Sequence, residues 1–244
     1  MIFVSTLLPI DVALGVIVYW LLLAFAGLLL QNTRTITRVI FPAGAAGALV
    51  LAAAALSGLG GPANVAVLPL GLPDLPFHLR MDSLSAFFML LLGAASIGIS
   101  LYSAGYFRDY EGNELGLLCF EYHIFLAAMA LVFLADDAYL FMVAWEAMAL
   151  SSYFLVTTDH VVPEIRRAGF LYLLIAHVGA IAILMCFGVM QGGHGDYTFA
   201  TMRNAHLNEL WASVTFLLAL FGFGAKAGIV PLHVWLPEAH PAAP

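Results

Sequence analysis

Apolar residues dominate seven long runs of this chain, and most polar residues gather in the segments between them. A run of about 17–25 mostly apolar residues is long enough for a helix to cross roughly 30 Å of hydrocarbon. The runs predict membrane helices at residues 10–31, 39–57, 83–105, 116–134, 138–156, 168–190 and 209–230. The predicted fold is therefore an all-α polytopic membrane bundle, in which helices satisfy the backbone polar groups.

The connecting segments differ in composition. Residues 58–82 form an outer loop rich in Gly and Pro with short extended stretches, which predicts a small hairpin. Residues 191–208 predict a polar loop with a partial amphipathic helix. Asp82 and the pair Asp136-Asp137 directly precede apolar runs, where a short acidic side chain is favoured as a helix N-cap.

Composition supports a membrane protein and excludes other classes. Hydrophobic residues make up 63% of the 244 residues and charged residues 9%, whereas soluble domains carry about 25% charged residues. The net charge of −7 is spread over the loops, so no nucleic acid is expected as a partner. Cys119 and Cys186 fall in apolar runs and are interpreted as packing residues.

Arginine placement predicts the orientation, because cytoplasmic loops carry an excess of basic residues. The loops after odd-numbered helices contain Arg34, Arg38, Arg108, Arg166 and Arg167. The opposite side holds Arg80 and Arg203. The N-terminus is therefore expected outside, with the multi-pass chain in the inner (plasma) membrane.

Two charged residues, Glu146 and Lys226, are each isolated in a long apolar run. Lys226 is the only lysine of the chain and the only charge in residues 211–232, and Glu146 is the only charge in residues 138–156. A charge near the centre of a membrane helix costs about 2.5–3.5 kcal/mol on insertion scales, and such groups usually pair or face internal water. The two residues are expected to form either a switchable proton site or a fixed ion pair between helices.

The seventh helix is predicted to break near Pro231, close to Lys226. Gly222, Gly224 and Gly228 weaken the helix, and Pro231 lacks the amide hydrogen needed to continue it. Free backbone groups at such a break can line an aqueous cavity. Close helix packing is the other interpretation of the glycines.

Three further residues in predicted helices have side chains that can take part in proton transfer. His177, in the middle of the sixth helix, suits a proton relay or a hydrogen bond to a neighbouring helix. Glu121 and His123 lie near the cytoplasmic start of the fourth helix. They are expected to face headgroups and water, with a proton entrance as the alternative.

Cofactor motifs are absent from the sequence. The segment GFGAK (222–226) is not a phosphate loop, because no Gly directly precedes Lys226 and no Ser or Thr follows it. His233 and His240 do not have the spacing of zinc ligands, and two cysteines cannot hold an iron–sulfur cluster. No cofactor or metal is expected, and the sequence leaves open whether the chain is part of an enzyme.

Several segments resemble the proton-translocating, antiporter-like subunits of respiratory complex I and Mrp antiporters. The segments with this resemblance are ADDAYLFMVAWEAMALSSYFLV (135–156), GFGAKAGIVPLHVWLPEAHPAAP (222–244) and MDSLSAFFMLLL (81–92). Two more, SAGYFRDYEG (103–112) and AHVGAIAI (176–183), are most similar to the large membrane subunit of hydrogenase 4 and formate hydrogenlyase.

The resemblance implies roles for single residues. Glu146 matches the family's fifth-helix glutamate and Lys226 its seventh-helix lysine, which together couple proton movement to redox chemistry in other subunits. Pro231 matches the break of a discontinuous helix, and His177 matches no assigned position. The implied partners are other membrane subunits and soluble iron–sulfur and nickel–iron hydrogenase subunits.

The resemblance also implies an organisation into domains. Residues 1–115 are expected to form a three-helix region, and residues 116–244 to hold helices four to seven of an incomplete antiporter-like repeat. Family members have about fourteen helices in two inverted repeats, so the chain is expected to be the N-terminal part of a longer protein or the product of a split gene. Three functions stay open: a proton-translocating hydrogenase-type subunit, a cation/proton antiporter subunit of the Mrp type, and a non-conducting structural fragment.

Overall fold

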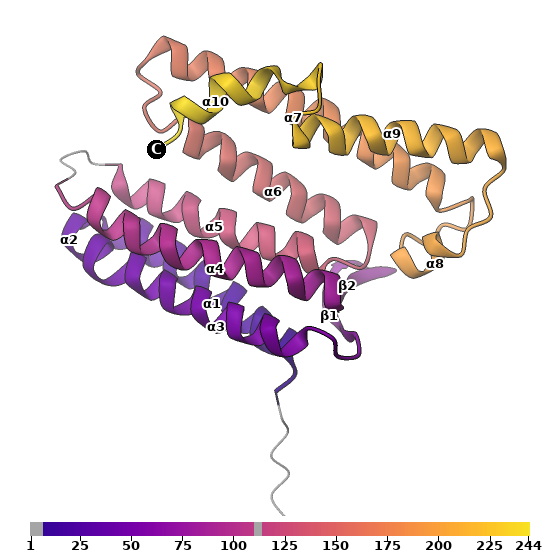
Figure 1. The fold of residues 1–244 in the computed structure, drawn as a ribbon, viewed down its shortest axis with the longest axis horizontal. Coiled ribbons are helices and arrows are strands. Elements are labelled where there is room, and N and C mark those ends of the chain that lie inside the picture. Colours follow the sequence, from indigo (N-terminus) through magenta and orange to yellow (C-terminus); the bar gives the residue numbers. More distant parts are fainter. Residues whose placement is uncertain (1–6, 110–113) are drawn as a thin grey trace, which may run out of the picture. The chain divides into compact units, whose positions relative to one another are not determined.

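A computed structural model describes residues 7–109 and 114–244 of the chain. The helices of the first four candidate membrane spans are α1 (Pro9–Leu30), α2 (Thr33–Thr35) continuing through η1 (Ile36–Ile40) and α3 (Phe41–Gly58), α4 (Ser83–Tyr106) and α5 (Leu115–Leu134). The last three spans are α6 (Ala138–Val156), α7 (Pro163–Met190) and the segment that begins with α9 (Glu209–Ala227) (Figure 1). The predicted all-α membrane bundle with seven spans is confirmed for the described residues. Residues 110–112 of the SAGYFRDYEG segment lie outside them.

Two spans begin earlier than hydropathy predicts. The second begins at Thr33 because the Asn32 side chain accepts hydrogen bonds from the amides of Arg34 and Thr35, at 3.0 and 3.3 Å. Helix α7 begins at Pro163, a residue suited to the first turn, and Glu164 follows where the helix dipole favours an acid. Helix capping thus extends both helices into polar sequence, which a hydropathy window does not include.

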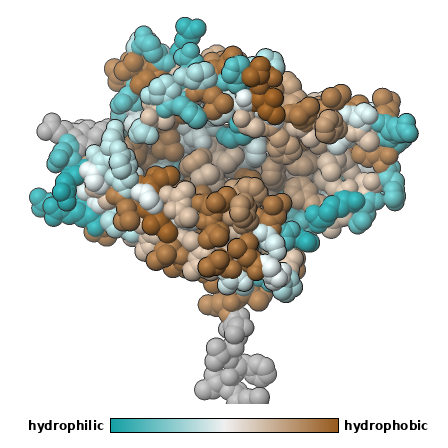
Figure 2. Space-filling model, in the orientation of Figure 1, coloured by the Kyte–Doolittle hydropathy of each residue, from teal (hydrophilic) through white to brown (hydrophobic). Residues whose placement is uncertain are grey.

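Apolar side chains remain exposed along the spans, as the brown surface in Figure 2 shows. Leu22 is 64% exposed, Leu29 80% and Phe216 66%. Large exposed apolar surfaces are rare in soluble monomers. Contact with lipid tails accounts for this surface, because lipid leaves no hydrophobic penalty for such side chains.

The described chain divides into two compact units: residues 1–68 with 78–135, and residues 69–77 with 136–244. In the first unit, α3 packs against α4 and α1 against α5. Small residues permit both contacts, since a Cβ atom on Gly93 would lie 2.8 Å from the Ala48 carbonyl oxygen and one on Gly116 2.9 Å from that of Gly27. The predicted boundary at residue 115 refers to an internal repeat and stays a prediction.

The outer loop contains the predicted hairpin, formed by β1 (Asn64–Leu72) and β2 (Leu75–Met81). Gly71 has φ +110°, a conformation that favours glycine, and a Cβ atom there would lie 2.7 Å from the Leu75 carbonyl oxygen. The expectation of a short helix in residues 191–208 is also confirmed, by α8 (Phe199–Arg203).

In the second unit, α9 runs along α7 (Figure 1). The two backbones approach closely at Gly222 of α9, where a Cβ atom would lie 2.7 Å from the Gly179 carbonyl oxygen. After α9 the chain forms η2 (Leu232–Trp235) and α10 (Leu236–Ala242). The seventh span is therefore broken, as predicted.

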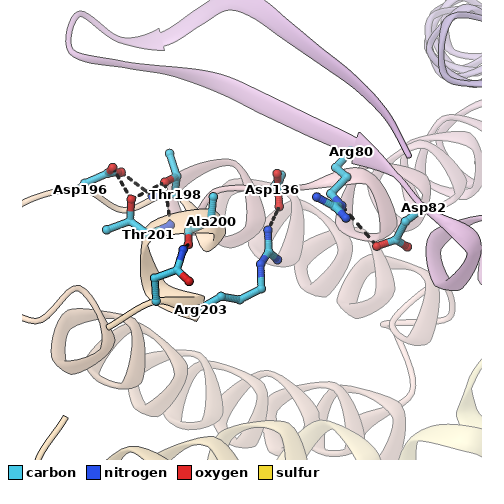
Figure 3. A network of polar contacts seen from close by, with 9 residues as sticks. Arg80, Asp82, Asp136, Asp196, Thr198, Ala200, Thr201 and Arg203 are labelled. Carbon is cyan, nitrogen blue, oxygen red and sulfur yellow. Dashed lines mark hydrogen bonds and ion pairs between the residues drawn. The ribbon is translucent and has the colours of Figure 1, made fainter. Parts of the chain in front are cut away.

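Acidic side chains cap two of the spans. The Asp82 carboxylate accepts from the amides of Leu84 and Ser85 at 3.1 and 3.0 Å, and Asp137 accepts from the amide of Leu140 at 2.7 Å. Arg80 donates to Asp82 at 3.3 Å, as Figure 3 shows. The predicted capping role is confirmed for Asp82 and Asp137.

Asp136 has a different role from its neighbour. Its carboxylate accepts from the Arg203 guanidinium at 3.4 Å, and so joins the start of α6 to the end of α8 (Figure 3). The prediction of a capping role for Asp136 is therefore wrong. Asp137, and not Asp136, occupies the N-cap position of α6.

We expect Asp82→Ala to lower the free energy of unfolding by about 1 kcal/mol at neutral pH, the usual cost of losing an N-cap. The Ser85 amide hydrogen bond, opposed by partial burial and assisted by Arg80, lowers the pKa of Asp82 below its ordinary 3.8. The ionised carboxylate therefore stabilises the fold above pH 3.8, and this contribution is lost as the pH falls through the folded-state value. Thermal unfolding in detergent above and below pH 3.8 tests this, with exposed Asp74→Ala as control. An equal loss at both pH values would contradict the capping role.

Candidate functional site

Four ionisable residues within the spans of the second unit form two contacting pairs, Glu146 with His177 and Lys226 with Tyr172. Glu146 is on α6, Tyr172 and His177 are on α7, and Lys226 is in the last turn of α9. The C-terminal end of a helix dipole stabilises a cation, so the last turn of α9 is a favourable position for the Lys226 ammonium group.

Glu146 lies within ion-pair distance of His177. The Nε2 atom of His177 lies 3.4 Å from Oε2 of Glu146, and its Nδ1 lies 3.0 Å from the Leu173 carbonyl oxygen. A carbonyl oxygen only accepts, so Nδ1 must carry a hydrogen. In the neutral ring Nε2 would then be an acceptor facing a second acceptor. The contact is favourable when one more proton is present, on Nε2 or on the carboxyl group.

Lys226 contacts aromatic residues of the other two helices. Its Nζ atom donates to the Tyr172 hydroxyl at 2.8 Å and lies 5.1 Å from the centroid of that ring. The Trp145 ring centroid is 6.0 Å away. Both distances suit a cation–π interaction, which strengthens where water is excluded. Tyr172 is only 3% exposed and Trp145 only 8%, so this side of the ammonium group is shielded from solvent.

The structure does not pair Glu146 with Lys226 directly. Within residues 7–109 and 114–244, Glu146 makes its ion pair with His177, and Lys226 makes its side-chain hydrogen bond with Tyr172. Both of these partners belong to α7. Glu146 also follows Trp145, which contacts Lys226, so the two charges are linked through α7 and one tryptophan.

The break after α9 positions a second aromatic ring at Tyr172. Gly228 ends the helix with φ +73°, and a Cβ atom there would collide with Leu236. The chain then returns so that the Trp235 indole donates to the Ala225 carbonyl oxygen at 2.9 Å. Its ring centroid lies 5.2 Å from that of Tyr172. Pro231 lies in this return segment and directly precedes η2.

The sequence predicts roles for Glu146, Lys226, His177 and Pro231, which stay predictions, and it does not single out Tyr172 or Trp145. A tryptophan directly before a glutamate in an apolar run is a usable signal for Trp145. Tyr172 had no such signal, because its contact with Lys226 joins residues 54 positions apart.

The expectation that Glu121 and His123 face headgroups and water is wrong. His123 is fully buried and Glu121 is 7% exposed. Both belong to α5, whose start packs closely against α1 through Gly116. Close packing thus removes from solvent a helix turn that the sequence places near the membrane surface.

Comparisons with known proteins identify related membrane proteins. Residues 135–244 match the transmembrane family described as NADH:quinone oxidoreductase/Mrp antiporter. Hydrogenase-4 component B of Escherichia coli (strain K12) is 48% identical over 166 residues, which cover 68% of this chain and 25% of that protein. Formate hydrogenlyase subunit 3 of the same strain is 28% identical over 202 residues, covering 81% and 30%.

A solved archaeal complex shares the fold. A chain of the membrane-bound sulfane sulfur reductase matches with a TM-score of 0.73 and 19% identity, covering 94% of this chain and 48% of that one. The present chain spans about a quarter to a third of the length of the two curated relatives. Together these similarities place the chain in the superfamily of antiporter-like membrane subunits shared by NADH:quinone oxidoreductases and Mrp antiporters.

Proposed function

We propose that the chain is the proton-translocating part of a membrane subunit in a hydrogenase-type oxidoreductase complex related to complex I. The observation that carries the proposal is the contact between Glu146 and His177, because both side chains belong to residue types that bind and release protons. The 48% identity to hydrogenase-4 component B supports the type of complex. Electron transfer would occur in partner subunits that carry iron–sulfur clusters and nickel–iron centres.

The proposed mechanism uses α7 to connect two charges. While Lys226 is held by Tyr172 and Trp145, its charge acts on Glu146 from a distance. A movement of α9 that brings the ammonium group closer favours the carboxylate of Glu146, so a proton passes to His177. A movement away favours protonated Glu146. Coupling to redox chemistry requires that partner subunits drive this movement.

A cation/proton antiporter subunit of the Mrp type is the second candidate, because the matching family includes Mrp antiporters. The two functions differ in what drives transport. Inverted membrane vesicles that acidify with a hydrogenase substrate and without added Na⁺ support the first. Proton movement that requires a Na⁺ gradient and no redox substrate supports the second. A chain that assembles and supports neither is a non-conducting structural fragment.

We expect Glu146→Gln to lower redox-driven proton translocation by about tenfold, a change of ~1.4 kcal/mol in a rate barrier. A glutamine side chain can still hydrogen-bond to His177, but it cannot release a proton. Fluorescent pH dyes in inverted vesicles measure the rate, normalised to the amount of assembled complex. Glu164→Gln is the matched control, because Glu164 is exposed in the first turn of α7. If Glu146→Gln lowers only the amount of assembled protein, the contact between Glu146 and His177 stabilises the fold and does not carry protons.

A further inference from the structure

The first unit contains a buried histidine on a helix that carries neither Glu146 nor Lys226. His123 of α5 is 0% exposed, and its Nδ1 atom lies 2.8 Å from the Cys119 carbonyl oxygen. That carbonyl only accepts, so Nδ1 carries the hydrogen and Nε2 has a free lone pair. Nε2 has no hydrogen-bond partner among the described residues. Unpaired buried polar atoms are rare in native proteins and call for an explanation.

A hydroxyl pair lies close to this lone pair. The Oγ atom of Ser100 on α4 is 2.8 Å from the Tyr122 hydroxyl on α5. A Cβ atom on Gly44 would lie 2.6 Å from Nε2 of His123 and 3.6 Å from Oγ of Ser100. Gly44 therefore lies against both the imidazole Nε2 and the Ser100 hydroxyl, so these two polar groups lie beside the same residue of α3. A single water molecule, or a small shift of the ring, can join them.

The backbone beside His123 is also unusual. The π-helical turn η1 directly precedes Phe41, whose ring stacks on His123 with centroids 6.2 Å apart. The same ring meets Tyr122 edge to face, with centroids 5.9 Å apart. Such turns are rare and frequently occur at functional sites. The irregular turn, the hydroxyl pair and the unpaired nitrogen thus meet at one place in the first unit.

We propose that His123 is a second proton-binding site of this chain. Nε2 accepts a proton from a hydronium ion, which leaves as water, and the imidazole becomes an imidazolium. The new N–H then donates to the hydroxyl oxygen of Ser100, directly or through one water molecule, and Ser100 remains bonded to Tyr122. This site lies outside the machinery of the proposed function and uses none of its residues.

Few titratable groups face this ring. On α5 itself they are Cys119, whose Sγ is 3.6 Å from Nδ1, and Tyr122. From α3 and α4 the neighbouring groups are Phe41, Gly44 and Ser100, none of which titrates. The hydroxyl pair is therefore the local acceptor for an imidazolium, and its removal should weaken proton binding.

Nitrogen NMR of the full chain, labelled with ¹⁵N-histidine in lipid nanodiscs, tests the proposal. Subtracting the spectrum of His123→Gln assigns the His123 signals. We expect Nε2 to be an unprotonated acceptor at alkaline pH and to become protonated as the pH is lowered. The double variant Ser100→Ala, Tyr122→Phe should weaken proton binding by about tenfold, which shifts the midpoint by about one pH unit.

Controls separate a proton site from a packing effect. Ser96→Ala removes another buried hydroxyl from α4 and should leave the midpoint unchanged. If His123→Gln does not fold, Gly44→Ala gives the assignment, because its methyl group would press on this imidazole. The proposal is overturned if the His123 imidazole stays neutral at every pH at which the protein is folded. It is also overturned if the double variant Ser100→Ala, Tyr122→Phe has the same protonation midpoint as Ser96→Ala. Lys226→Ala should not change the titration, so this proposal and the proposed function can fail separately.

Discussion

Replacement of Lys226 by alanine is expected to reduce redox-driven proton translocation by at least about tenfold, or ~1.4 kcal/mol in the rate barrier. The change removes the only lysine of the chain and the cation held by Tyr172 and Trp145. Without that charge, movement of α9 no longer changes the field at Glu146. The measurement is vesicle acidification per assembled complex, with the amount of complex determined by immunoblotting.

Two variants separate charge from packing at this position. Lys226→Arg keeps a cation and should retain more activity than alanine, although the guanidinium differs in shape. Tyr172→Phe keeps the ring 5.1 Å from Nζ and removes only the hydroxyl acceptor, so an intermediate rate is expected. Normal translocation in a fully assembled Lys226→Ala complex would contradict the role of the lysine.

Substitution of Gly222 by alanine is expected to move α9 away from α7 and to lower the free energy of unfolding by about 1–3 kcal/mol, as for overpacked cores. The added methyl group would lie 2.6 Å from Cγ1 of Ile183 and 2.7 Å from the Gly179 carbonyl oxygen. Backbone cannot rotate aside as a flexible side chain can. Since Lys226 lies one turn further along α9, its bond to Tyr172 should lengthen, and translocation should fall with stability.

Gly224→Ala is the matched control on the same helix. Its methyl group would meet only the end of the Ile229 side chain, at 3.3 Å, which can move. Thermal unfolding in detergent and vesicle acidification should therefore distinguish the two variants. Equal behaviour of Gly222→Ala and Gly224→Ala would show that close contact between α7 and α9 is unimportant.

Much of the fold could be predicted from the sequence because lipid imposes simple requirements. A span must be long, apolar and helical, so hydropathy located all seven spans. Turn-forming residues indicated the hairpin, and glycines with Pro231 indicated the break in the last span. Glu146, His177 and Lys226 are visible in the sequence as isolated polar residues in apolar runs.

The partners of these groups could not be predicted, because hydropathy does not determine how each helix is rotated. The pairing of Glu146 with His177 and of Lys226 with Tyr172 depends on the faces that α6, α7 and α9 present to one another. Helices that are apolar on every side give little information about that rotation. The burial of His123 was missed for a related reason, since it depends on glycine contacts between helices distant in sequence.

The return of the chain after α9 gives the second unit a mechanical property. The Trp235 indole donates a hydrogen bond to the Ala225 carbonyl oxygen, in the helical turn that contains Lys226. The Trp235 ring also contacts the ring of Tyr172, whose hydroxyl accepts from Lys226. A displacement of η2 would therefore act on both partners of the hydrogen bond between Lys226 and Tyr172. Movement of an uncharged segment would in this way change the length of the hydrogen bond that Lys226 donates to Tyr172.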